Sequence, residues 1–599
     1  MKANRHRSVC LKKETSILKI LRFPLAGLGL LLVSSSCPLQ PRAGFSIWAT
    51  GDSVKIFPRE PISRENHHWS SSSATLTLRG AANEWVGSQL VLYSLEPLKG
   101  IRVRVGDLKG ESGTISASNV SFFRQIYIPV SRSTPREGST GPGEYPDPLI
   151  PFFNPYSGQD EEIALPLSLE GGRNLPIWVD LFIPPGTSPG LYRGEIEVYS
   201  GRERLAAADF KVEVWNFSLP SRRQLMVFFD LYPFRWSRGE GRPFTLSATT
   251  WEVLKHYEIM AQSHGFSLGH QGLMPAEIEA DGPVDWSFYD LYLGQVLDGT
   301  LFADGAPPAC WRLPFDEAWE PGEEVLRNYA RQVVEHWEEK NWNLQNSFAY
   351  VFDERGPWNQ QVKDYGEILR EESDGRINYF YTAAPHPNLY GVVNWWAPRA
   401  SEYSPGLARE RQRLGERAVF YHAGEPAVGL MCLDAIGLAF RTWGWMAWKY
   451  QADGFFGWAA NFWGESPYTD PVSFHLDNGN LYVFYPGNRL PDIGLPPIPG
   501  PVSSFRMKMV RRGIQDYEYF HLAALLGIDP DPVVSSVVRK GLDETGSYGI
   551  DPQAWSRDPE DWYRARDRLG GLIHDHFNRL DQKEAEYVTG QKDQDREDH

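Results

Sequence analysis

Cysteine is scarce in this chain of 599 residues, which contains only four. Cys10 and Cys37 lie in a basic N-terminal segment, so only Cys310 and Cys432 remain in the body of the chain. Two cysteines are too few for a disulfide framework or a zinc site. Both stand among apolar residues, and we expect them to be buried thiols.

The sequence also lacks a GxGxxG motif, a P-loop and an HExxH motif. These motifs hold dinucleotides, phosphates and zinc, so we expect neither a cofactor nor a metal. The formal charge of the chain is −16, and the N-terminal segment contributes +6, which leaves −22 for the remainder. A protein this acidic is a poor binder of nucleic acid or of anionic lipid headgroups.

Residues 1–37 predict an export signal. Basic residues precede a short apolar run, 23–33, which is followed by three serines and Cys37. The apolar run is too short to span a bilayer, and this order is typical of a bacterial signal peptide. Cys37 after small residues resembles a lipobox and would carry a lipid, although Ser34 departs from that motif. We therefore expect an exported protein, either a membrane-anchored lipoprotein or a periplasmic or secreted one.

Residues 45–218 predict an all-β domain. Runs of alternating apolar and polar residues are separated by Gly/Pro turns, a spacing typical of a β-sandwich. A Gly/Pro/Asp-rich segment, 134–160, interrupts them and predicts a long loop. The expected strands are 74–79, 88–93, 101–105, 122–130, 176–183, 192–199 and 209–217.

Residues 222–527 predict an α/β (β/α)8 barrel of the TIM type, because short apolar runs alternate with helical patterns. The fifth connection, 383–391, is short and Pro-rich. A helical appendage at 528–588 and a disordered polar tail at 589–599 would complete the multidomain chain. The expected barrel strands are 225–229, 266–269, 309–313, 347–353, 377–382, 392–396, 417–422 and 454–460. The expected helices are 247–264, 286–297, 321–340, 359–371, 402–412, 431–450 and 503–525.

The fourth expected strand, 347–353, leads into two adjacent carboxylates, Asp353 and Glu354. Its small and aromatic residues alternate, so they lie on opposite faces. The interior of a barrel is cramped, and we expect the small residues to face inward and the aromatic residues to pack against helices. In such a barrel the carboxyl ends of the strands carry the chemistry, which makes the acid pair the candidate catalytic site.

Glycosidic hydrolysis needs a proton donor and a group that stabilises the anomeric centre. We expect Glu354 to be the general acid, with its pKa raised by partial burial and by the neighbouring charge, while Asp353 stays ionised. Adjacent acids are badly placed to flank one bond from opposite sides. They suit a substrate-assisted reaction, in which the substrate's own 2-acetamido oxygen attacks and Asp353 orients the amide.

The run Tyr350–Glu354, the block Leu481–Gly487 and the block Pro501–Tyr519, with a sandwich ahead of them, resemble glycoside hydrolase family 123. The wider set that shares the C-terminal block is known as domain of unknown function 4091. The resemblance covers roughly 45–525. It implies a β-N-acetylgalactosaminidase that acts on a glycan or glycoconjugate, with the stabilising role on Asp353 and the acid role on Glu354.

Aromatic residues are abundant, with 22 Trp, 27 Tyr and 31 Phe, and aromatic faces stack on sugar rings. At the ends of expected strands, Tyr381, Trp396 and Trp463 would form the acetamido pocket. Only one of the adjacent Trp395 and Trp396 should reach it. Further candidates for substrate binding at strand ends are Asp230, Tyr421, His422 and Asn461.

Two other functions remain open at this point. The first is a two-carboxylate retaining glycosidase, with Glu354 as acid/base and Glu425 as nucleophile after the seventh strand. Asp316 and Glu317, after the third strand, offer a further acid pair. The second is a non-catalytic, glycan-binding surface lipoprotein.

Overall fold

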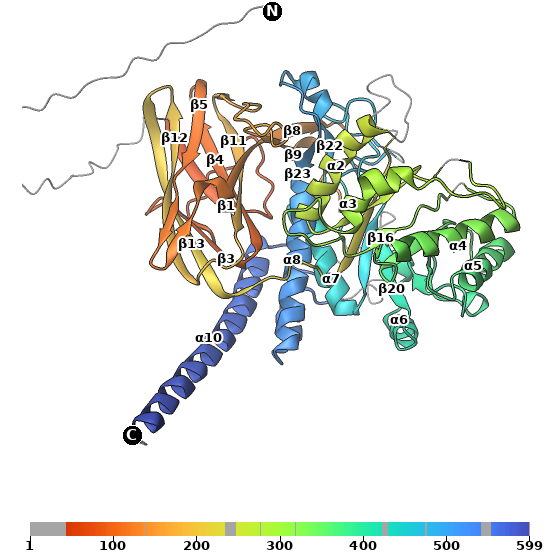
Figure 1. Ribbon diagram of the computed structural model, residues 1–599. Helices are drawn as coiled ribbons and strands as arrows, with labels where there is room; N and C mark the ends of the chain where they lie inside the picture. The colour runs from red at the N-terminus through yellow and green to blue at the C-terminus, as the bar shows by residue number, and fades with distance from the viewer. Residues whose placement is uncertain are drawn as a thin grey trace, which may run out of the picture. The chain divides into compact units, whose positions relative to one another are not determined.

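The structure is a computed structural model. It describes residues 44–597 except 137, 234–246, 276, 318, 422–428, 474–475 and 541–552, with side chains up to residue 582. The predicted fold class is confirmed: N-terminal β-sheets are followed by eight parallel strands with helices and by C-terminal helices (Figure 1). In the described part of the chain, no helix is both long enough and apolar enough to cross a membrane.

The sandwich consists of two sheets whose neighbouring strands are antiparallel except for β3 and β13. One sheet has the order β1-β4-β11-β8-β9-β23-β22, and the other has the order β10-β5-β12-β13-β3-β2 with β6 and β7 at its side. The strands are β1 (Phe45–Gly51), β2 (Trp69–Ser70), β3 (Thr75–Ala82), β4 (Glu84–Ser94), β5 (Leu98–Val105), β6 (Leu108–Gly110), β7 (Gly113–Ile115), β8 (Val120–Val130), β9 (Gly143–Pro151), β10 (Leu167–Leu169), β11 (Arg173–Ile183), β12 (Gly190–Ser200), β13 (Glu203–Ser218), β22 (Tyr485–Pro486) and β23 (Pro501–Ser504).

Two strands of the first sheet come from the far end of the chain. β23 pairs with β9, with Ser503 opposite Leu149, and β22 pairs with β23. The predicted boundary between sandwich and barrel therefore does not separate the two sets of strands. The segment 134–160, predicted to be a loop, contains β9.

The barrel strands are all parallel and have the order β15-β14-β21-β20-β19-β18-β17-β16. No ladder joins β15 to β16, so the barrel is nearly closed. Each strand overlaps one of the eight predicted from the sequence. They are β14 (Met226–Leu231), β15 (Ser267–His270), β16 (Trp311–Arg312), β17 (Ser347–Tyr350), β18 (Asn378–Tyr381), β19 (Trp395–Trp396), β20 (Arg417–Tyr421) and β21 (Gly454–Gly457).

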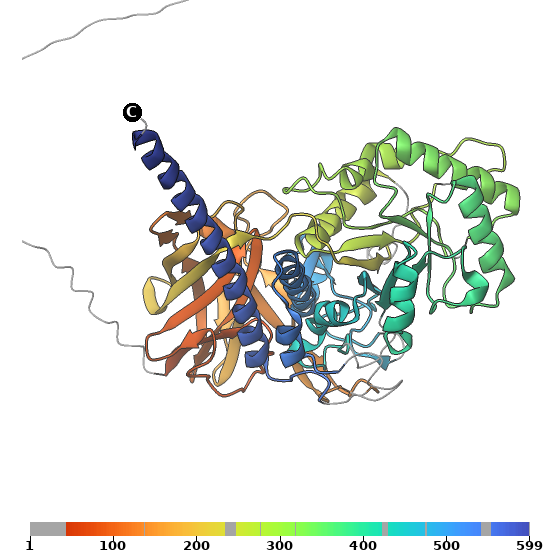
Figure 2. The ribbon, with the colours of Figure 1, turned by 90° about the horizontal axis from the view of Figure 1, so that it is seen from below.

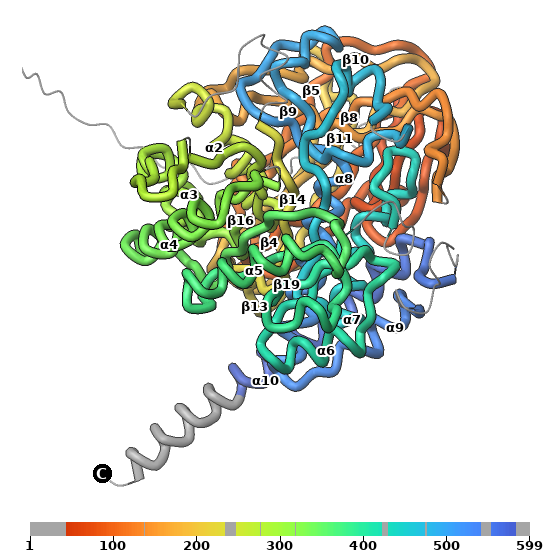
Figure 3. Tube along the Cα trace, turned by 90° about the vertical axis from the view of Figure 1, so that its right-hand side faces the viewer, coloured from red at the N-terminus to blue at the C-terminus, as the bar shows by residue number. Residues whose placement is uncertain are grey.

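Helices cover most of the connections, and Figure 3 shows α4, α5 and α6 in succession along the barrel wall. The fifth connection has only a 3-10 turn, η3 (Pro387–Leu389), as its Pro-rich sequence predicts. In the seventh connection the α-helix begins at Thr442, later than the predicted start at residue 431. The helices are α2 (Ala248–Ser263), η2 (Tyr289–Leu293), α3 (Gly294–Leu297), α4 (Glu323–Glu339), α5 (Gln360–Glu372), α6 (Pro405–Gln412), η6 (Gly437–Phe440), α7 (Thr442–Tyr450) and α8 (Phe505–Leu525).

Aromatic side chains fill the barrel interior. Phe228 of β14 contacts Phe348 of β17, with ring centroids 4.9 Å apart, although these strands are not neighbours. Phe380 and Phe456 belong to the same cluster. The prediction that the small residues of β17 face inward is therefore wrong. Large rings are needed to fill the axis without voids, whereas small outward residues let the covering helices approach.

Helix α8 lies between the sandwich and the rest of the barrel (Figures 1 and 2). Phe505 meets Trp178 of β11 edge-on, with ring centroids 5.7 Å apart. β11 is therefore covered on both faces, by the second sheet and by α8, which explains why almost all of its residues are buried.

The C-terminal segment forms α9 (Asp531–Val537) and α10 (Pro559–Glu597). α10 extends to Glu597, so the tail predicted to be disordered, 589–599, is helical except for its last two residues, which lie outside the described part. One face of the first half of α10 packs against the sandwich, where Arg566 is only 2% exposed.

Buried charged groups around α8 connect the sandwich, the barrel and α10. Asp516 accepts hydrogen bonds from Arg441 (2.7 Å) and Arg566 (3.0 Å). Arg566 also pairs with Glu84 of the sandwich. Although burial alone would raise it, the pKa of Asp516 is held below its ordinary value, with Arg441 as the strongest of the opposing cations.

Replacing Asp516 with asparagine would leave the buried Arg441 without its carboxylate partner, and Arg566 would keep only Glu84. We expect the free energy of unfolding to fall by about 3–5 kcal/mol, measured by urea unfolding at pH 7. The matched control is Glu323→Gln, because Glu323 is 62% exposed and pairs with Arg327 on the surface of α4. The control should cost less than about 0.5 kcal/mol. Equal effects of the two substitutions would contradict a structural role for the buried network.

Candidate active site

The acid pair lies at the carboxyl end of β17, as predicted. Val351 and Phe352 are fully buried, and the exposed Asp353 and Glu354 follow them. Glu354 adopts a φ of 46°, in the left-handed region. This conformation costs a non-glycine residue about 1–2 kcal/mol and turns the chain over the mouth of the barrel. Neighbours in an extended strand point to opposite sides, and this turn breaks that alternation, so both acids can face the mouth.

Two hydroxyl groups hold one oxygen of Asp353. Tyr350 Oη and Thr382 Oγ1 each donate a hydrogen bond to Asp353 Oδ1, both at 2.8 Å. Thr382 follows β18 directly, and its oxygen also accepts the backbone N–H of Glu354 at 2.8 Å. Burial raises the pKa of Tyr350 well above its ordinary value, so its hydroxyl stays a donor. One threonine therefore fixes both acids.

Glu354 is paired with a cation. Arg399 Nη2 lies 2.5 Å from Glu354 Oε2, and Arg399 Nε lies 3.2 Å from Oε1. Tyr421, at the end of β20, donates its hydroxyl to Oε1. Although partial burial alone would raise it, the bonds from Arg399 and Tyr421 lower the pKa of Glu354 below its ordinary value. The expectation that this pKa is raised is wrong for the free protein, because Arg399 was not foreseen.

A second pair of acids, Asp230 and Glu317, contacts the buried Arg312 next to Tyr350, which holds Asp353. Arg312, on β16, donates to Asp230 of β14 at 2.9 Å and to Glu317 at 3.1 Å. Its guanidinium group lies 4.5 Å from the centre of the Tyr350 ring. Burial raises the pKa of Asp230 to about 7, against the attraction of Arg312, and also raises the pKa of Glu317. The cluster therefore supports Tyr350, and through it Asp353.

The structure brings only some of the predicted binding residues to the mouth. Tyr421 is there, and Asp230 is buried just below it as the partner of Arg312. His422, like the alternative nucleophile Glu425, lies outside the described residues.

Three predicted residues of the acetamido pocket do not line the mouth. Trp396 has no exposed surface, and its indole N–H donates to Glu416 in the layer outside the barrel. Tyr381 is also fully buried, and its hydroxyl donates to the backbone oxygen of Gly356. Trp463 is 6% exposed and packs in the core. The sequence pattern shows that successive side chains of a strand point to opposite faces, but it does not show which of the two faces lies toward the cleft.

Neither Trp395 nor the predicted Asn461 lines the mouth. Trp395 points into the barrel below the mouth, where its ring contacts Phe348. Asn461 has no exposed surface and bonds both the backbone N–H and the backbone oxygen of Tyr232. Asn461 therefore fixes the loop after β14 and does not contact the cleft directly.

Sequence reasoning missed Thr382 and Arg399, and it assigned Tyr350 and Arg312 no role in the site. Thr382 was the last residue of a predicted strand, so a survey of every polar residue at a strand end would have found it. Arg399 lies three residues beyond β19, and its contact with Glu354 depends on the path of that loop. Among the described residues, no three His, Cys, Asp or Glu side chains are arranged to hold a metal ion.

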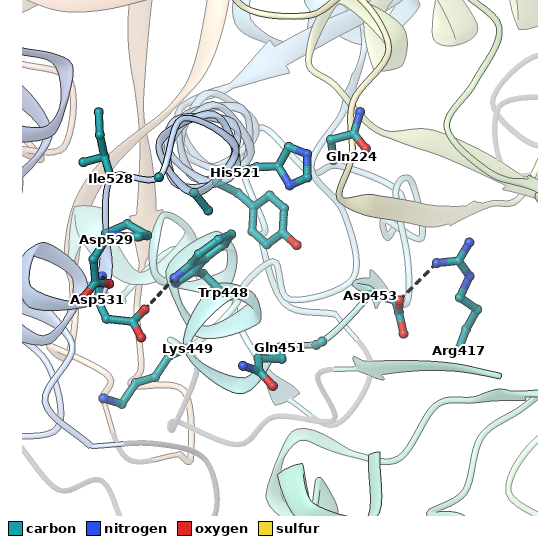
Figure 4. A pocket seen from close by; sticks show the side chains of 15 residues that line it. Gln224, Arg417, Trp448, Lys449, Gln451, Asp453, His521, Ile528, Asp529 and Asp531 are labelled. Carbon is teal, nitrogen blue, oxygen red and sulfur yellow. Dashed lines mark hydrogen bonds and ion pairs between the residues drawn. The ribbon is translucent and has the colours of Figure 1, made fainter. Parts of the chain in front are cut away.

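A cavity of about 640 Å³ lies at the opposite end of the barrel (Figure 4). Its wall includes Gln224, Arg417 and Asp453, which stand at the amino ends of β14, β20 and β21. Arg417 pairs with Asp453 there, and the indole N–H of Trp448 donates to Asp531. Neither acid of the pair lines this cavity.

Two family models match the sequence. The model described as glycoside hydrolase 123, catalytic domain, matches residues 312–523, and the model of the glycoside hydrolase 123 N-terminal domain matches residues 62–200. The first therefore spans the acid pair and the second lies in the sandwich. No curated protein sequence matches the chain.

The chain is similar to several solved structures to different degrees. A family 123 glycoside hydrolase from Clostridium perfringens, studied for glycolipid glycan hydrolysis, matches with a TM-score of 0.63 at 15% identity, covering 92% of this chain and 100% of its own. A family 39 glycoside hydrolase from Bacteroides cellulosilyticus has a TM-score of 0.31 at 9% identity, covering 74% of this chain and 82% of its own. A Bacteroides ovatus xyloglucanase has a TM-score of 0.28 at 7% identity, covering 74% of this chain and 99% of its own.

Replacing Arg399 with alanine should raise the pKa of Glu354, because the strongest stabiliser of its charged form is lost. The carboxyl ¹³C shift of Glu354, assigned by comparison with Glu354→Gln, would follow the titration. Arg355→Ala is the matched control, since Arg355 is next to Glu354 in sequence but pairs with Glu320. A titration curve that moves equally in both variants would contradict the ion pair.

Proposed function

Because the chain belongs to glycoside hydrolase family 123, whose N-terminal and catalytic models match it in succession, it is a glycoside hydrolase, and we propose that it removes a terminal β-linked 2-acetamido-2-deoxyhexose of galacto configuration. The proposed substrates are glycans or glycoconjugates. The glycan of a glycolipid is one such class, because the Clostridium perfringens enzyme was studied for glycolipid glycan hydrolysis. The family assignment favours a hydrolase over a non-catalytic glycan-binding protein.

The observation that carries this proposal is the unequal environment of two adjacent acids. Hydroxyl groups hold Asp353 through Oδ1, and no described residue bonds its Oδ2. That oxygen can accept the N–H of the substrate's 2-acetamido group. The amide is thereby oriented, and its oxygen gains electron density toward the anomeric carbon. Asp353 would in this way direct the substrate's own nucleophile.

Glu354 would then act as acid and as base. In the first step the acetamido oxygen bonds to the anomeric carbon, the glycosidic bond breaks, and Glu354 gives its proton to the leaving oxygen. The first step leaves a cyclic intermediate in which the acetamido oxygen is bonded to the anomeric carbon. In the second step Glu354 takes a proton from water, the water oxygen attacks that carbon, and its bond to the acetamido oxygen breaks. Two inversions at that carbon retain its configuration.

The acid role requires Glu354 to be protonated when the substrate is bound, whereas Arg399 favours its charged form in the free protein. A bound sugar excludes water from the mouth and places the leaving oxygen beside Glu354, and both changes favour the protonated form. Apo geometry of this kind is common for catalytic acids, whose bonds rearrange in the substrate complex.

We also propose that the protein acts outside the cytoplasm. The N-terminal signal supports export, and Cys37 after small residues supports a lipid anchor, although both lie outside the described residues. Such an anchor would place the barrel near glycoconjugates at a membrane surface.

Replacing Glu354 with glutamine should lower kcat by about 10²–10⁴-fold on an oligosaccharide, which needs its leaving oxygen protonated. A nitrophenyl glycoside should lose much less, because its leaving group departs without acid help. Rates on both substrates measure the difference. The matched control is Glu335→Gln, at an exposed position on α4. An equal loss on the two substrates would contradict the acid role.

A thiazoline analogue of the cyclic intermediate should inhibit the wild type and bind Asp353→Asn about 10–100-fold more weakly, since a hydrogen bond to a charged group is lost. Calorimetry measures both affinities. If a two-carboxylate mechanism with Glu425 as nucleophile operates instead, the analogue should bind no better than the free sugar. That result would overturn the substrate-assisted reaction and leave the hydrolase assignment intact.

A further inference from the structure

A tryptophan stands in solvent on the loop that carries the acid pair. Trp358 is 76% exposed, more than any other large apolar side chain in the described part of the protein. It follows Glu354 by four residues. Its ring meets His386 edge-on, with centroids 4.9 Å apart, so the loops after β17 and β18 touch there. Single exposed apolar residues are ordinary on protein surfaces, so whether Trp358 marks a binding site depends on the residues around it.

The barrel wall beside Trp358 is open because the fifth connection has no α-helix. Helix α5 covers the wall before β18, and α6 covers it after β19. Only the short segment 387–392, with η3, runs between them. A groove of about 650 Å³ remains between α5 and that segment, and Trp358 lines it.

The lining of the groove points to a carbohydrate. Its other side chains are mainly amides and charged groups, namely Asn359, Gln360, Lys363, Glu367, Arg370 and Asn388. An indole face packs on the apolar face of a pyranose ring, and amides and charged groups bond its hydroxyls. An acyl chain would need continuous apolar walls, whereas here six polar or charged side chains stand among the apolar Pro357, Pro387, Tyr390 and Val392.

The proposed chemistry sets the direction of the bound glycan. A general acid touches the leaving-group oxygen, so the leaving sugar must lie on the side of Glu354. The loop from Glu354 continues directly to Trp358 and then into α5. Trp358, which lines the groove, therefore stands on the same loop as Glu354, four residues beyond it.

We propose that Trp358 and this groove bind the leaving-group portion of an oligosaccharide substrate, that is, the sugars on the reducing-end side of the cleaved bond. This inference rests on the proposed function and adds that the enzyme reads the glycan beyond the residue it removes. Its substrates would therefore be oligosaccharides or glycoconjugates with several sugars.

The test compares two substrates that share the terminal 2-acetamido sugar. One is its nitrophenyl glycoside, whose leaving group is a single aromatic ring that does not extend along the groove. The other is a tetrasaccharide. Trp358→Ala should reduce kcat/KM for the tetrasaccharide about tenfold more than for the nitrophenyl glycoside, mainly through KM. Trp358→Phe should restore most of the difference. The control is Leu414→Ala, because Leu414 is 66% exposed but stands before β20, at the other end of the barrel.

Equal losses on the two substrates, or no loss on either, would overturn the inference. So would a dependence on Trp358 that is seen only with a lipid-linked glycan, because the occupant would then be the lipid. If the wild type cleaves neither substrate, the proposed function fails separately. Calorimetry of the tetrasaccharide with Glu354→Gln, with and without Trp358→Ala, then decides about the groove: weaker binding supports it and unchanged binding overturns it.

Discussion

Helix α8 carries charged side chains into the interior of the protein, and its position depends on how those charges are paired. Arg506 meets Asp147 of β9, and Lys508 and Arg511 meet Asp180 of β11. Further along, Asp516 meets Arg441 from the barrel. A buried charge that loses its partner costs about 3–5 kcal/mol, so neither the sandwich nor the barrel can move away from α8 without that penalty. The same helix also contacts the barrel sheet, because Glu518 accepts the backbone N–H of Gln224, two residues before β14.

Packing of the barrel and placement of the acids are linked through two tyrosines. The rings of Tyr350 and Tyr421 belong to the aromatic cluster inside the barrel, in contact with Phe456. Their hydroxyl groups emerge at the top of that cluster, where Tyr350 donates to Asp353 and Tyr421 to Glu354. Because closely packed rings cannot shift without opening voids, the two donors stay fixed. Inward-facing aromatic residues thus position the acids as well as fill the barrel.

The sequence predicts the eight barrel strands and the acid pair because both depend on local patterns, namely short apolar runs and two carboxylates at a strand end. It does not predict which face of a strand points inward, and this is why Tyr381 and Trp396 were placed in the pocket. Contacts between distant loops also leave no local signal, since Arg399 and Glu354 are 45 positions apart. The charges of α8 resemble those of a surface helix, and only their partners in the sandwich explain their burial.

The two acids differ in the kind of donor that holds them, and this difference bears on how a substrate could activate the site. Neutral hydroxyl groups hold Asp353, and among the described residues no cation pairs with it. A cation holds Glu354, so gaining a proton and weakening the bond to Arg399 are one coupled change. A ligand can drive such a change only by binding more tightly to the protonated form. A glycosidic oxygen does this, because it accepts a hydrogen bond from the carboxylic acid and offers none to the carboxylate.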